Sequence, residues 1–232
     1  GGRAGGRRGG EERDWGRDPG ALDAARADIA RADIVIATML FLEDHVRAIL
    51  PALEARREQC DAMLVLMSAG DIVKLTRMGG YRMDAPARGP LALLKKLRGS
   101  PKPGGNSGAG QMKMLRRLPK ILKFIPGTAQ DVRHYFLTLQ YWLAGSDDNV
   151  VSMIRGLIDR YAAGERAALK GTTPAQAPRD YPEIGLYHPA LPERITEDAA
   201  RMPRSRSATG TVGVLLLRSY LLGKDAGHYD GM

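Results

Sequence analysis

Residues 61–67 read DAMLVLM, and this short apolar run indicates a strand that is buried on both faces. A similar run, ADIVIAT at residues 32–38, lies upstream, and a helical pattern separates the two runs. Residues 71–78, DIVKLTRM, follow the second run and are predicted to form a short helix. Alternation of strands and helices is typical of a parallel α/β sheet. Ligands gather at the carboxyl ends of strands in such sheets, so the loops 39–45 and 68–71 are candidate binding loops.

A third strand is predicted farther along the chain, where residues 211–217 read TVGVLLL. Between the second and third strands, residues 111–163 carry apolar side chains at three- and four-residue steps, which indicates helices. The predicted fold class is therefore α/β, an incomplete parallel sheet with flanking helices and a helical insertion at about residues 111–163. Pro51 is expected to kink or split the helix that follows the first strand, near Leu50.

Composition shifts divide the chain into six expected segments. They are 1–14, a disordered Gly/Arg-rich tail; 15–98, an α/β half with two strands; 99–110, a flexible linker; 111–163, the helical unit; 164–210, a Pro-rich loop region; and 211–232, the third strand and the start of a truncated helix. The Gly/Arg-rich tail also leaves open an RGG-type function in nucleic-acid binding, although it has no aromatic residue to stack on bases.

Composition excludes several classes of protein. Apolar residues make up 44% of the 232 residues and charged residues 26%, which is ordinary for a globular protein. No apolar run approaches the roughly 18 residues of a membrane-spanning helix, and no secretory leader is visible. The single cysteine, Cys60, cannot form an internal disulfide or a cysteine-based zinc site, so we expect a reducing, cytoplasmic setting.

Positive charge is concentrated in one part of the chain. The net charge is +9, and residues 85–130 contain ten basic residues and no acidic one. Within this region the segment 111–125 has the pattern of a basic amphipathic helix. Such a surface attracts an anionic ligand, lipid, nucleic acid or protein, although packing of its apolar side on the rest of the domain is the simpler interpretation. Its candidate binding residues are Arg116, Arg117, Lys120 and Lys123.

Two further places carry candidate contacts. Asp131 and His134 are three residues apart on one predicted helix, so they are expected to pair for a structural or partner-binding purpose. Polar residues follow the predicted third strand, and Arg218, Lys224 and His228 among them are candidate ligand contacts. No catalytic residue and no metal site are predicted, because no set of ligands with suitable spacing is found.

Several long runs of the sequence resemble the amino-terminal region of a known family, the large, porphyrin-binding H subunit of magnesium chelatase. The runs are MLFLEDH (39–45), LPALEARREQCDAM (50–63), MSAGDIVKLTRMG (67–79), LLKKLRG (93–99), QMKMLRRLPKILKFIPGTAQDVRHYFLTLQYWLAGSDDNV (111–150) and GTVGVLLLRSYLLGKDAGHYDG (210–231). The family's first strand would precede Trp15, where this chain has its Gly/Arg run, and the family's large carboxyl-terminal body is absent. We therefore expect an amino-terminal fragment and transfer no catalytic residue to it.

The resemblance implies a function that composition and spacing do not. Family members hold protoporphyrin IX and work with an AAA+ ATPase subunit and a second small subunit to insert Mg²⁺, using ATP, in chlorophyll or bacteriochlorophyll biosynthesis. We expect the chain to be part of that ligase, to hold no cofactor itself and to be inactive alone. Porphyrin propionates suit Arg and Lys as partners, so the cationic candidates above could bind the porphyrin or a partner protein. A cytoplasmic location is expected, with peripheral contact at a photosynthetic membrane left open, and no nucleic-acid partner is expected.

Two alternatives remain open. One is the large subunit of a cobaltochelatase, which resembles this sequence less. The other is a non-enzymatic binding module whose basic helix meets an anionic membrane, a nucleic acid or a protein, and salt-sensitive binding by the chain alone would distinguish it.

Overall fold

The computed structural model describes residues 19–86, 117–203, 209–210, 213–222 and 227. The chain divides into two compact units. Unit 1 comprises residues 1–137 and 157–173, and unit 2 comprises residues 138–156 and 174–232.

The described part of unit 1 is built on a mixed sheet with the strand order β1-β2-β3-β4. Its strands are β1 (Ile34–Thr38), β2 (Ala62–Leu66), β3 (Arg77–Met78) and β4 (Tyr81–Arg82). β1 and β2 are parallel, in a register that pairs Ile34 with Ala62, which confirms the first two predicted strands. β3 and β4 form an antiparallel hairpin beside β2. The predicted short helix is correct only at its start, in α3 (Gly70–Val73), because its last two residues form β3.

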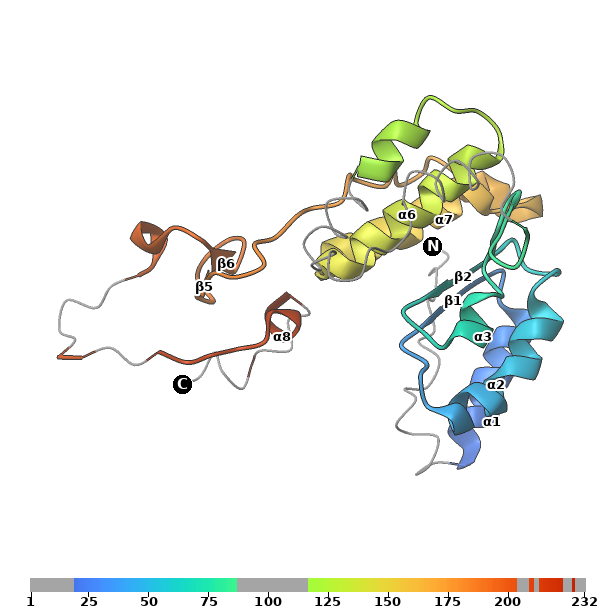
Figure 1. Cartoon of the computed structure of the whole chain (residues 1–232), viewed down its shortest axis with the longest axis horizontal. Coiled ribbons are helices and arrows are strands. Elements are labelled where there is room, and N and C mark those ends of the chain that lie inside the picture. The colour runs from blue at the N-terminus through green and yellow to red at the C-terminus, as the bar shows by residue number, and fades with distance from the viewer. Residues whose placement is uncertain (1–18, 87–116, 204–208, 211–212, 223–226, 228–232) are drawn as a thin grey trace, which may run out of the picture. The chain divides into compact units, whose positions relative to one another are not determined.

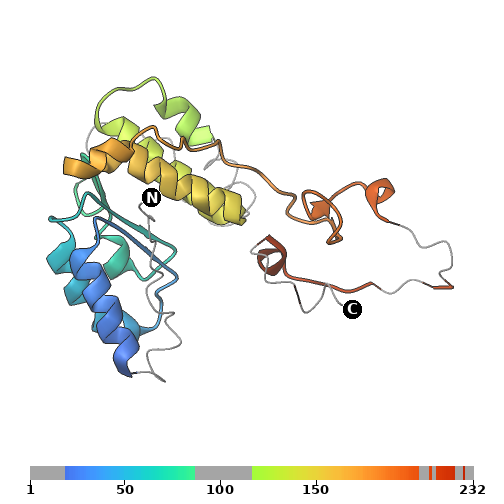
Figure 2. The same ribbon diagram turned by 180° about the vertical axis from the view of Figure 1, so that it is seen from behind.

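Two helices cover one face of this sheet, as Figures 1 and 2 show from opposite sides. They are α1 (Pro19–Arg31) and α2 (Glu43–Arg56). Val35 of β1 and Met63 of β2 pack with Ile49 and Leu53 of α2 in one hydrophobic core. The opposite face of β2 is buried as well, since Leu64 and Leu66 are inaccessible to solvent. Burial on both faces explains why the sequence of β2 is continuously apolar instead of alternating.

Pro51 does not split α2. The helix runs without a break from Glu43 to Arg56 with Pro51 inside it, so the predicted break near Leu50 is wrong. A proline removes one backbone hydrogen bond, but burial of Ile49 and Leu53 on the core-facing side holds the helix together.

A helical hairpin follows, made of α6 (Thr128–Ala144) and α7 (Asp147–Tyr161). Gly145 and Ser146 form the turn, both with positive φ, 69° and 78°. The start of α6 and the end of α7 belong to unit 1, and the tip of the hairpin belongs to unit 2. The 3₁₀ helix η2 (Gly164–Leu169) follows α7 in unit 1.

The buried face of the hairpin differs from the apolar stripes in the sequence. In unit 2, Thr138, Asn149 and Ser152 are buried, whereas Val151 and Ile154 are 42% and 41% exposed. Trp142, placed on the buried stripe by the sequence pattern, is only half-buried. Small and polar side chains that find hydrogen-bond partners are buried here, and apolar periodicity alone does not reveal them.

The rest of unit 2 has little regular structure in its described residues. It contains β5 (Leu186–Tyr187), β6 (Ile195–Thr196), the 3₁₀ helix η3 (Ala199–Arg201) and α8 (Arg218–Leu222). β5 and β6 pair antiparallel as a small separate sheet.

The predicted third strand at 211–217 is wrong for residues 213–217, which have no strand pairing; 211–212 lie outside the described residues. Leu215 and Leu217 of this segment are 100% and 66% exposed. A strand-like composition does not by itself make a strand, because strand propensity takes effect only where a partner strand is available. The strand that follows β2 in the sheet is β3, which pairs with it antiparallel. The incomplete parallel sheet is therefore a mixed one.

Candidate functional site

The carboxyl ends of β1 and β2 form the edge where the sequence predicted binding loops. Each strand is followed by a methionine in the left-handed region, Met39 with φ 62° and Met67 with φ 43°. The Met39 amide donates to the Met67 carbonyl at 2.9 Å, and the Ala69 amide donates to the Leu40 carbonyl at 2.8 Å. The hydroxyl of Ser68 also accepts from the Leu40 amide. These bonds lock the two loops together and offset the strain of two non-glycine residues in this region.

The side chains at this edge are mainly apolar. Met39, Phe41 and Leu42 are 51%, 54% and 61% exposed. Glu43 and Asp44 follow them in the first turn of α2. The edge can therefore offer an apolar contact next to negative charge, but it presents no set of polar groups that would activate a substrate.

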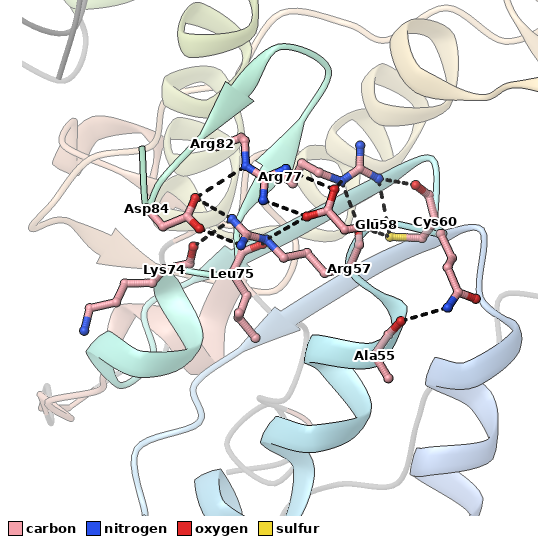
Figure 3. Close-up of polar contacts among 10 residues, drawn as sticks. Ala55, Arg57, Glu58, Cys60, Lys74, Leu75, Arg77, Arg82 and Asp84 are labelled. Atoms are coloured by element: carbon pink, nitrogen blue, oxygen red, sulfur yellow. Dashed lines mark hydrogen bonds and ion pairs between the residues drawn. The ribbon is translucent and has the colours of Figure 1, made fainter. Parts of the chain in front are cut away.

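A network of charged side chains joins the end of α2 to the β3–β4 hairpin, as Figure 3 shows. The buried guanidinium of Arg57 donates to both carboxylate oxygens of Asp84, at 2.7 and 2.6 Å. It also donates to the backbone carbonyls of Lys74 and Leu75. The Arg57 guanidinium lowers the pKa of Asp84 to about 2. Arg57 is thus fully used in holding the fold.

The same network surrounds the single cysteine (Figure 3). Arg77 donates to the backbone carbonyls of Arg57 and Cys60. Arg82 forms a two-bond ion pair with Glu58, at 3.0 and 2.7 Å. Cys60 is buried, and burial raises the pKa of its thiol. A buried thiol with a raised pKa is a poor nucleophile, so Cys60 is a core residue.

Asp131 lies at the centre of a second polar cluster, where α6 meets the β3–β4 turn and the end of α7. Its Oδ2 accepts the Gly80 amide at 2.9 Å. Its Oδ1 accepts the Arg160 side chain at 2.9 Å from Nε and the Tyr161 hydroxyl at 3.1 Å. The carboxylate of Asp131 therefore hydrogen-bonds to these three groups, while its charge still acts on the nearby His134. A structural or partner-binding role for the Asp131–His134 pair stays a prediction. The three hydrogen-bond partners of Asp131 thus lie more than 25 residues away from it in the sequence.

His134 is half-buried beside Tyr161, with the two rings edge-on and their centroids 5.5 Å apart. Burial lowers the pKa of His134 to about 4, and the charges of Arg160 and Arg133 act in the same direction. The ring is therefore neutral near pH 7. It is a packed core histidine, as its position on a half-buried helix would suggest.

The basic segment before α6 is partly described. Residues 117–122 are helical, and the side chains of Arg117, Lys120 and Lys123 are exposed. Leu118 and Leu122 are buried, which confirms that one side of this helix packs on the domain. Arg116, the fourth candidate, lies outside the described residues.

Phe124 is the feature of this segment that the sequence pattern missed. Its side chain is 84% exposed, and that of Ile121 is 48% exposed. Neither residue lies at the four-residue spacing of the buried Leu118 and Leu122, and that offset is the signal that could have placed them outside. The result is a surface that combines three cations with two apolar side chains.

The remaining candidate ligand contacts, Arg218, Lys224 and His228, lie near the end of the sequence. In unit 2, Arg218 donates to the backbone carbonyls of Pro182 at 2.8 Å and Tyr181 at 3.3 Å, and also to that of Ala144. Its guanidinium holds backbone in place, and no strand precedes it in residues 213–217, so the expected strand end is wrong; a ligand contact at Arg218 stays a prediction. Lys224 and His228 lie outside the described residues.

A pocket of about 410 Å³ opens at the amino ends of β1 and β2. Arg166 enters it and pairs with Asp61, at 3.1 and 3.2 Å, and with Asp33 at 3.3 Å. Arg31, also in the lining, pairs with Asp28. The ion pairs of Arg166 therefore attach η2 to the sheet, and the three carboxylates and two guanidiniums named here are all engaged in ion pairs.

Metal insertion would require oxygen or nitrogen ligands grouped around an ion. In the described ranges, no three or more His, Cys, Asp or Glu side chains are grouped so that they could hold a metal. No helix within these ranges is long and apolar enough to cross a membrane. The described geometry thus defines an α/β module with a basic, partly apolar surface, suited to binding or docking.

Comparison with known proteins shows which families this chain resembles. The family described as "Domain of unknown function (DUF3479)" matches residues 10–136, and the family CobN/Magnesium Chelatase matches residues 139–232. The chain is 55% identical to the magnesium-chelatase H subunit of Cereibacter sphaeroides and 50% identical to that of Rhodobacter capsulatus, over 94% of its length in both cases. It is 30% identical over 92% of its length to the chloroplastic magnesium-chelatase ChlH subunit of Oryza sativa subsp. indica.

The chain belongs to the family of magnesium-chelatase H subunits, and it corresponds to the amino-terminal region of that large subunit. It spans 18% of the length of the two bacterial relatives and 16% of the rice relative. The two matched families meet between residues 136 and 139, inside α6. The two compact units part at the same place, between Leu137 and Thr138.

Proposed function

We propose that the chain is an amino-terminal part of the porphyrin-binding subunit of an ATP-dependent magnesium chelatase. The complete enzyme inserts Mg²⁺ into protoporphyrin IX on the route to chlorophyll or bacteriochlorophyll, in the cytoplasm. The observation that carries this proposal is the 55% identity to a magnesium-chelatase H subunit over 94% of the chain. The substrate, the ATP requirement and the two partners, an AAA+ ATPase subunit and a second small subunit, are part of the proposal.

Within that enzyme, we assign this region to binding and assembly. Insertion needs a base to take the pyrrole protons and ligands to deliver Mg²⁺. The carboxylates of the two polar clusters are instead committed to arginines, as Asp84 is to Arg57 and Asp131 is to Arg160. The exposed cations and apolar side chains of residues 117–124 are better suited to contacts than to proton transfer.

A chimera tests the proposal. The chain would replace the matching 219-residue region of the Cereibacter sphaeroides H subunit, and the product would be mixed with the two partner subunits, ATP, Mg²⁺ and protoporphyrin IX. We expect Mg-porphyrin fluorescence to appear at a rate within about tenfold of the parent enzyme, and only with ATP present. A chimera that folds but forms no Mg-porphyrin, while the parent does, would contradict the proposal.

The same assay distinguishes a magnesium chelatase from the alternative, a cobaltochelatase. That alternative is considered because the matching family is named for both CobN and magnesium chelatase. In that arm, Co²⁺ and a corrinoid acceptor replace Mg²⁺ and protoporphyrin IX. We expect no metal insertion there, because the relatives that match over most of this chain are named as magnesium chelatases. Insertion of Co²⁺ with no insertion of Mg²⁺ would favour the alternative.

A further inference from the structure

The turn that precedes α6 carries an unusual combination of side chains on its surface. We call residues 117–124 the basic turn. It consists of helical residues 117–122 and the turn that begins at Lys123. Phe124 and Ile121 are exposed, by 84% and 48%. Arg117, Lys120 and Lys123 are exposed around them.

The exposure of Phe124 is not due to a loosely attached segment. Leu118 and Leu122 on the inner side are 5% and 1% exposed, so that side of the turn is already packed. The side-chain amide of Gln130 donates to the carbonyls of Leu122, at 2.8 Å, and Ile125, at 2.5 Å. These bonds from one side chain fix the backbone where the helix ends. The turn is fixed with Phe124 pointing away from the core.

The guanidinium of Arg133 holds the turn at a second point, where its Nε donates to the Pro119 carbonyl at 3.0 Å. Both anchors, Gln130 and Arg133, belong to α6, which is the helix that follows. The exposed side chains of the basic turn are thus preorganised, which lowers the entropy cost of binding a partner.

The cations of the basic turn have no acidic partner in the part of the chain that the structure describes. Arg117, Lys120 and Lys123 occur in none of its ion pairs, whereas Lys74 pairs with Asp71 and Arg47 with Glu43. The sequence has no acidic residue between positions 85 and 130. Three exposed positive charges thus lie within the same eight residues as two exposed apolar side chains.

We propose that the basic turn is an attachment site for the surface of an anionic lipid bilayer. Cations that ring exposed aromatic and aliphatic side chains match a bilayer interface, where anionic headgroups lie above acyl chains. Phe124 and Ile121 enter the boundary between headgroups and acyl chains, while Arg117, Lys120 and Lys123 bind the headgroups. A nucleic acid fits less well, because the turn offers one aromatic side chain for stacking and no strip of them.

The apolar loop at the carboxyl edge of the sheet serves as an internal comparison. Phe41 and Leu42 are exposed to a similar degree, but Glu43 and Asp44 follow them. An anionic bilayer would repel that loop. The proposal therefore predicts that membrane binding depends on Phe124 and not on Phe41.

Vesicle co-sedimentation tests the proposal with the 232-residue chain. One set of vesicles contains equal amounts of phosphatidylglycerol and phosphatidylcholine, and the other contains phosphatidylcholine alone. We expect binding to the anionic vesicles that weakens as salt is raised, because screening shortens the range of the charges to about 8 Å at physiological ionic strength. Equal binding to both sets of vesicles, or no binding to either, would overturn the proposal.

Variants locate the binding on the basic turn. Each Lys near an anionic surface contributes about a fivefold gain in affinity, so Lys120→Gln with Lys123→Gln should weaken binding about 30-fold. Phe124→Ser should weaken it about tenfold, because less apolar surface is buried. The matched controls are Lys74→Gln with Lys170→Gln, which makes the same change in charge elsewhere, and Phe41→Ser. We expect both controls to bind like the parent chain, and thermal melts should show that every variant is folded.

Two outcomes of these measurements would contradict membrane attachment through the basic turn. If Phe124→Ser and the double lysine variant bind vesicles like the parent chain, other basic residues attach the chain and the proposal is wrong. If these variants keep vesicle binding but lose quenching of protoporphyrin IX fluorescence, the basic turn binds the dicarboxylate porphyrin instead.

Discussion

At the scale of single residues, Asp131 joins three segments of unit 1 that are distant in the sequence. Its carboxylate joins the β3–β4 turn, through Gly80, to the end of α7, through Arg160 and Tyr161. Asp131→Ala would leave a backbone amide and a guanidinium without their acceptor. We expect a loss of about 3 kcal/mol in the free energy of unfolding, measured by urea titration.

The control for Asp131→Ala is Asp71→Ala, which removes an exposed carboxylate that pairs with the nearby Lys74. Exposed pairs of this kind contribute about 0–1 kcal/mol. If the two variants unfold at the same urea concentration, the Asp131 cluster does not hold the unit together.

His134 makes stability depend on pH. Its pKa is about 4 in the folded chain, lowered mainly by burial, against about 6.5 in the unfolded chain. Between these values the unfolded chain binds a proton that the folded chain does not, so stability falls as the pH is lowered from 6.5 to 4. We expect the loss in the free energy of unfolding to reach about 3 kcal/mol near pH 4 and to be absent above pH 6.5.

The measurement for His134 compares urea titrations of the parent chain and His134→Gln at intervals between pH 4 and pH 7. The glutamine side chain cannot titrate, so the variant should lose less stability over this range. An identical pH dependence in both proteins would mean that another group causes the loss.

At the scale of elements, the tight β3–β4 turn is fitted to α6 at one glycine. Gly79 has φ +57°, and a Cβ at this position would lie 2.7 Å from Oδ2 of Asp131. Gly79→Ala should therefore destabilise the chain in two ways, through its backbone conformation and through the collision with Asp131. We expect a loss of about 3 kcal/mol, measured by urea titration.

Gly127 provides the matched control, because its φ is +75° and a Cβ there would meet nothing within 4 Å. Gly127→Ala should cost only the backbone term, about 1 kcal/mol. The difference between the two variants measures the close approach of Asp131 to the turn. Equal losses in the free energy of unfolding for the two variants would show that the β3–β4 turn can move away from α6 without a free-energy cost.

In unit 2, one side chain attaches the segment after residue 174 to the tip of the helical hairpin. Asn149 is 1% exposed. Its amide donates to the carbonyls of Gly145, at 2.8 Å, and Arg179, at 2.9 Å, and its oxygen accepts the Arg179 amide at 2.9 Å. Asn149→Ala would remove these three hydrogen bonds, at a cost of about 2–3 kcal/mol.

Hydrogen exchange provides the readout for Asn149→Ala. We expect the amide of Arg179 to exchange at least tenfold faster in the variant, while the amides of β2 keep their protection. Unchanged exchange at Arg179 would show that Asn149 is not the main attachment of this segment.

At the scale of the whole molecule, the described residues contain no group of three or more His, Cys, Asp or Glu side chains that could hold a metal ion. We therefore expect the 232-residue chain, supplied as the only large subunit with both partner subunits, ATP and Mg²⁺, to form no Mg-protoporphyrin. The complete H subunit of Cereibacter sphaeroides is the positive control under the same conditions. Mg-porphyrin fluorescence from the chain alone would reveal an insertion site within these 232 residues.

The sequence by itself determined the local elements with the strongest patterns. The two apolar runs at 34–38 and 62–66 are strands, and the periodic segments that became α2, α6 and α7 are helices. Their hydrophobic spacing matches the geometry of the element, so a window of about ten residues is sufficient. The family resemblance is also visible in the sequence alone, because long runs of similar residues in the same order can be recognised without knowing which residues contact one another.

Tertiary structure decided which of those elements pair and where polar groups find partners. Residues 213–217 have the composition of a strand but no pairing, and the strand that follows β2 in the sheet is β3. Asp131 bonds to Gly80 and Arg160, which lie 51 and 29 residues away, and not to the nearby His134. Buried carboxylates take the partners that packing brings within hydrogen-bond distance, and sequence spacing does not contain that information.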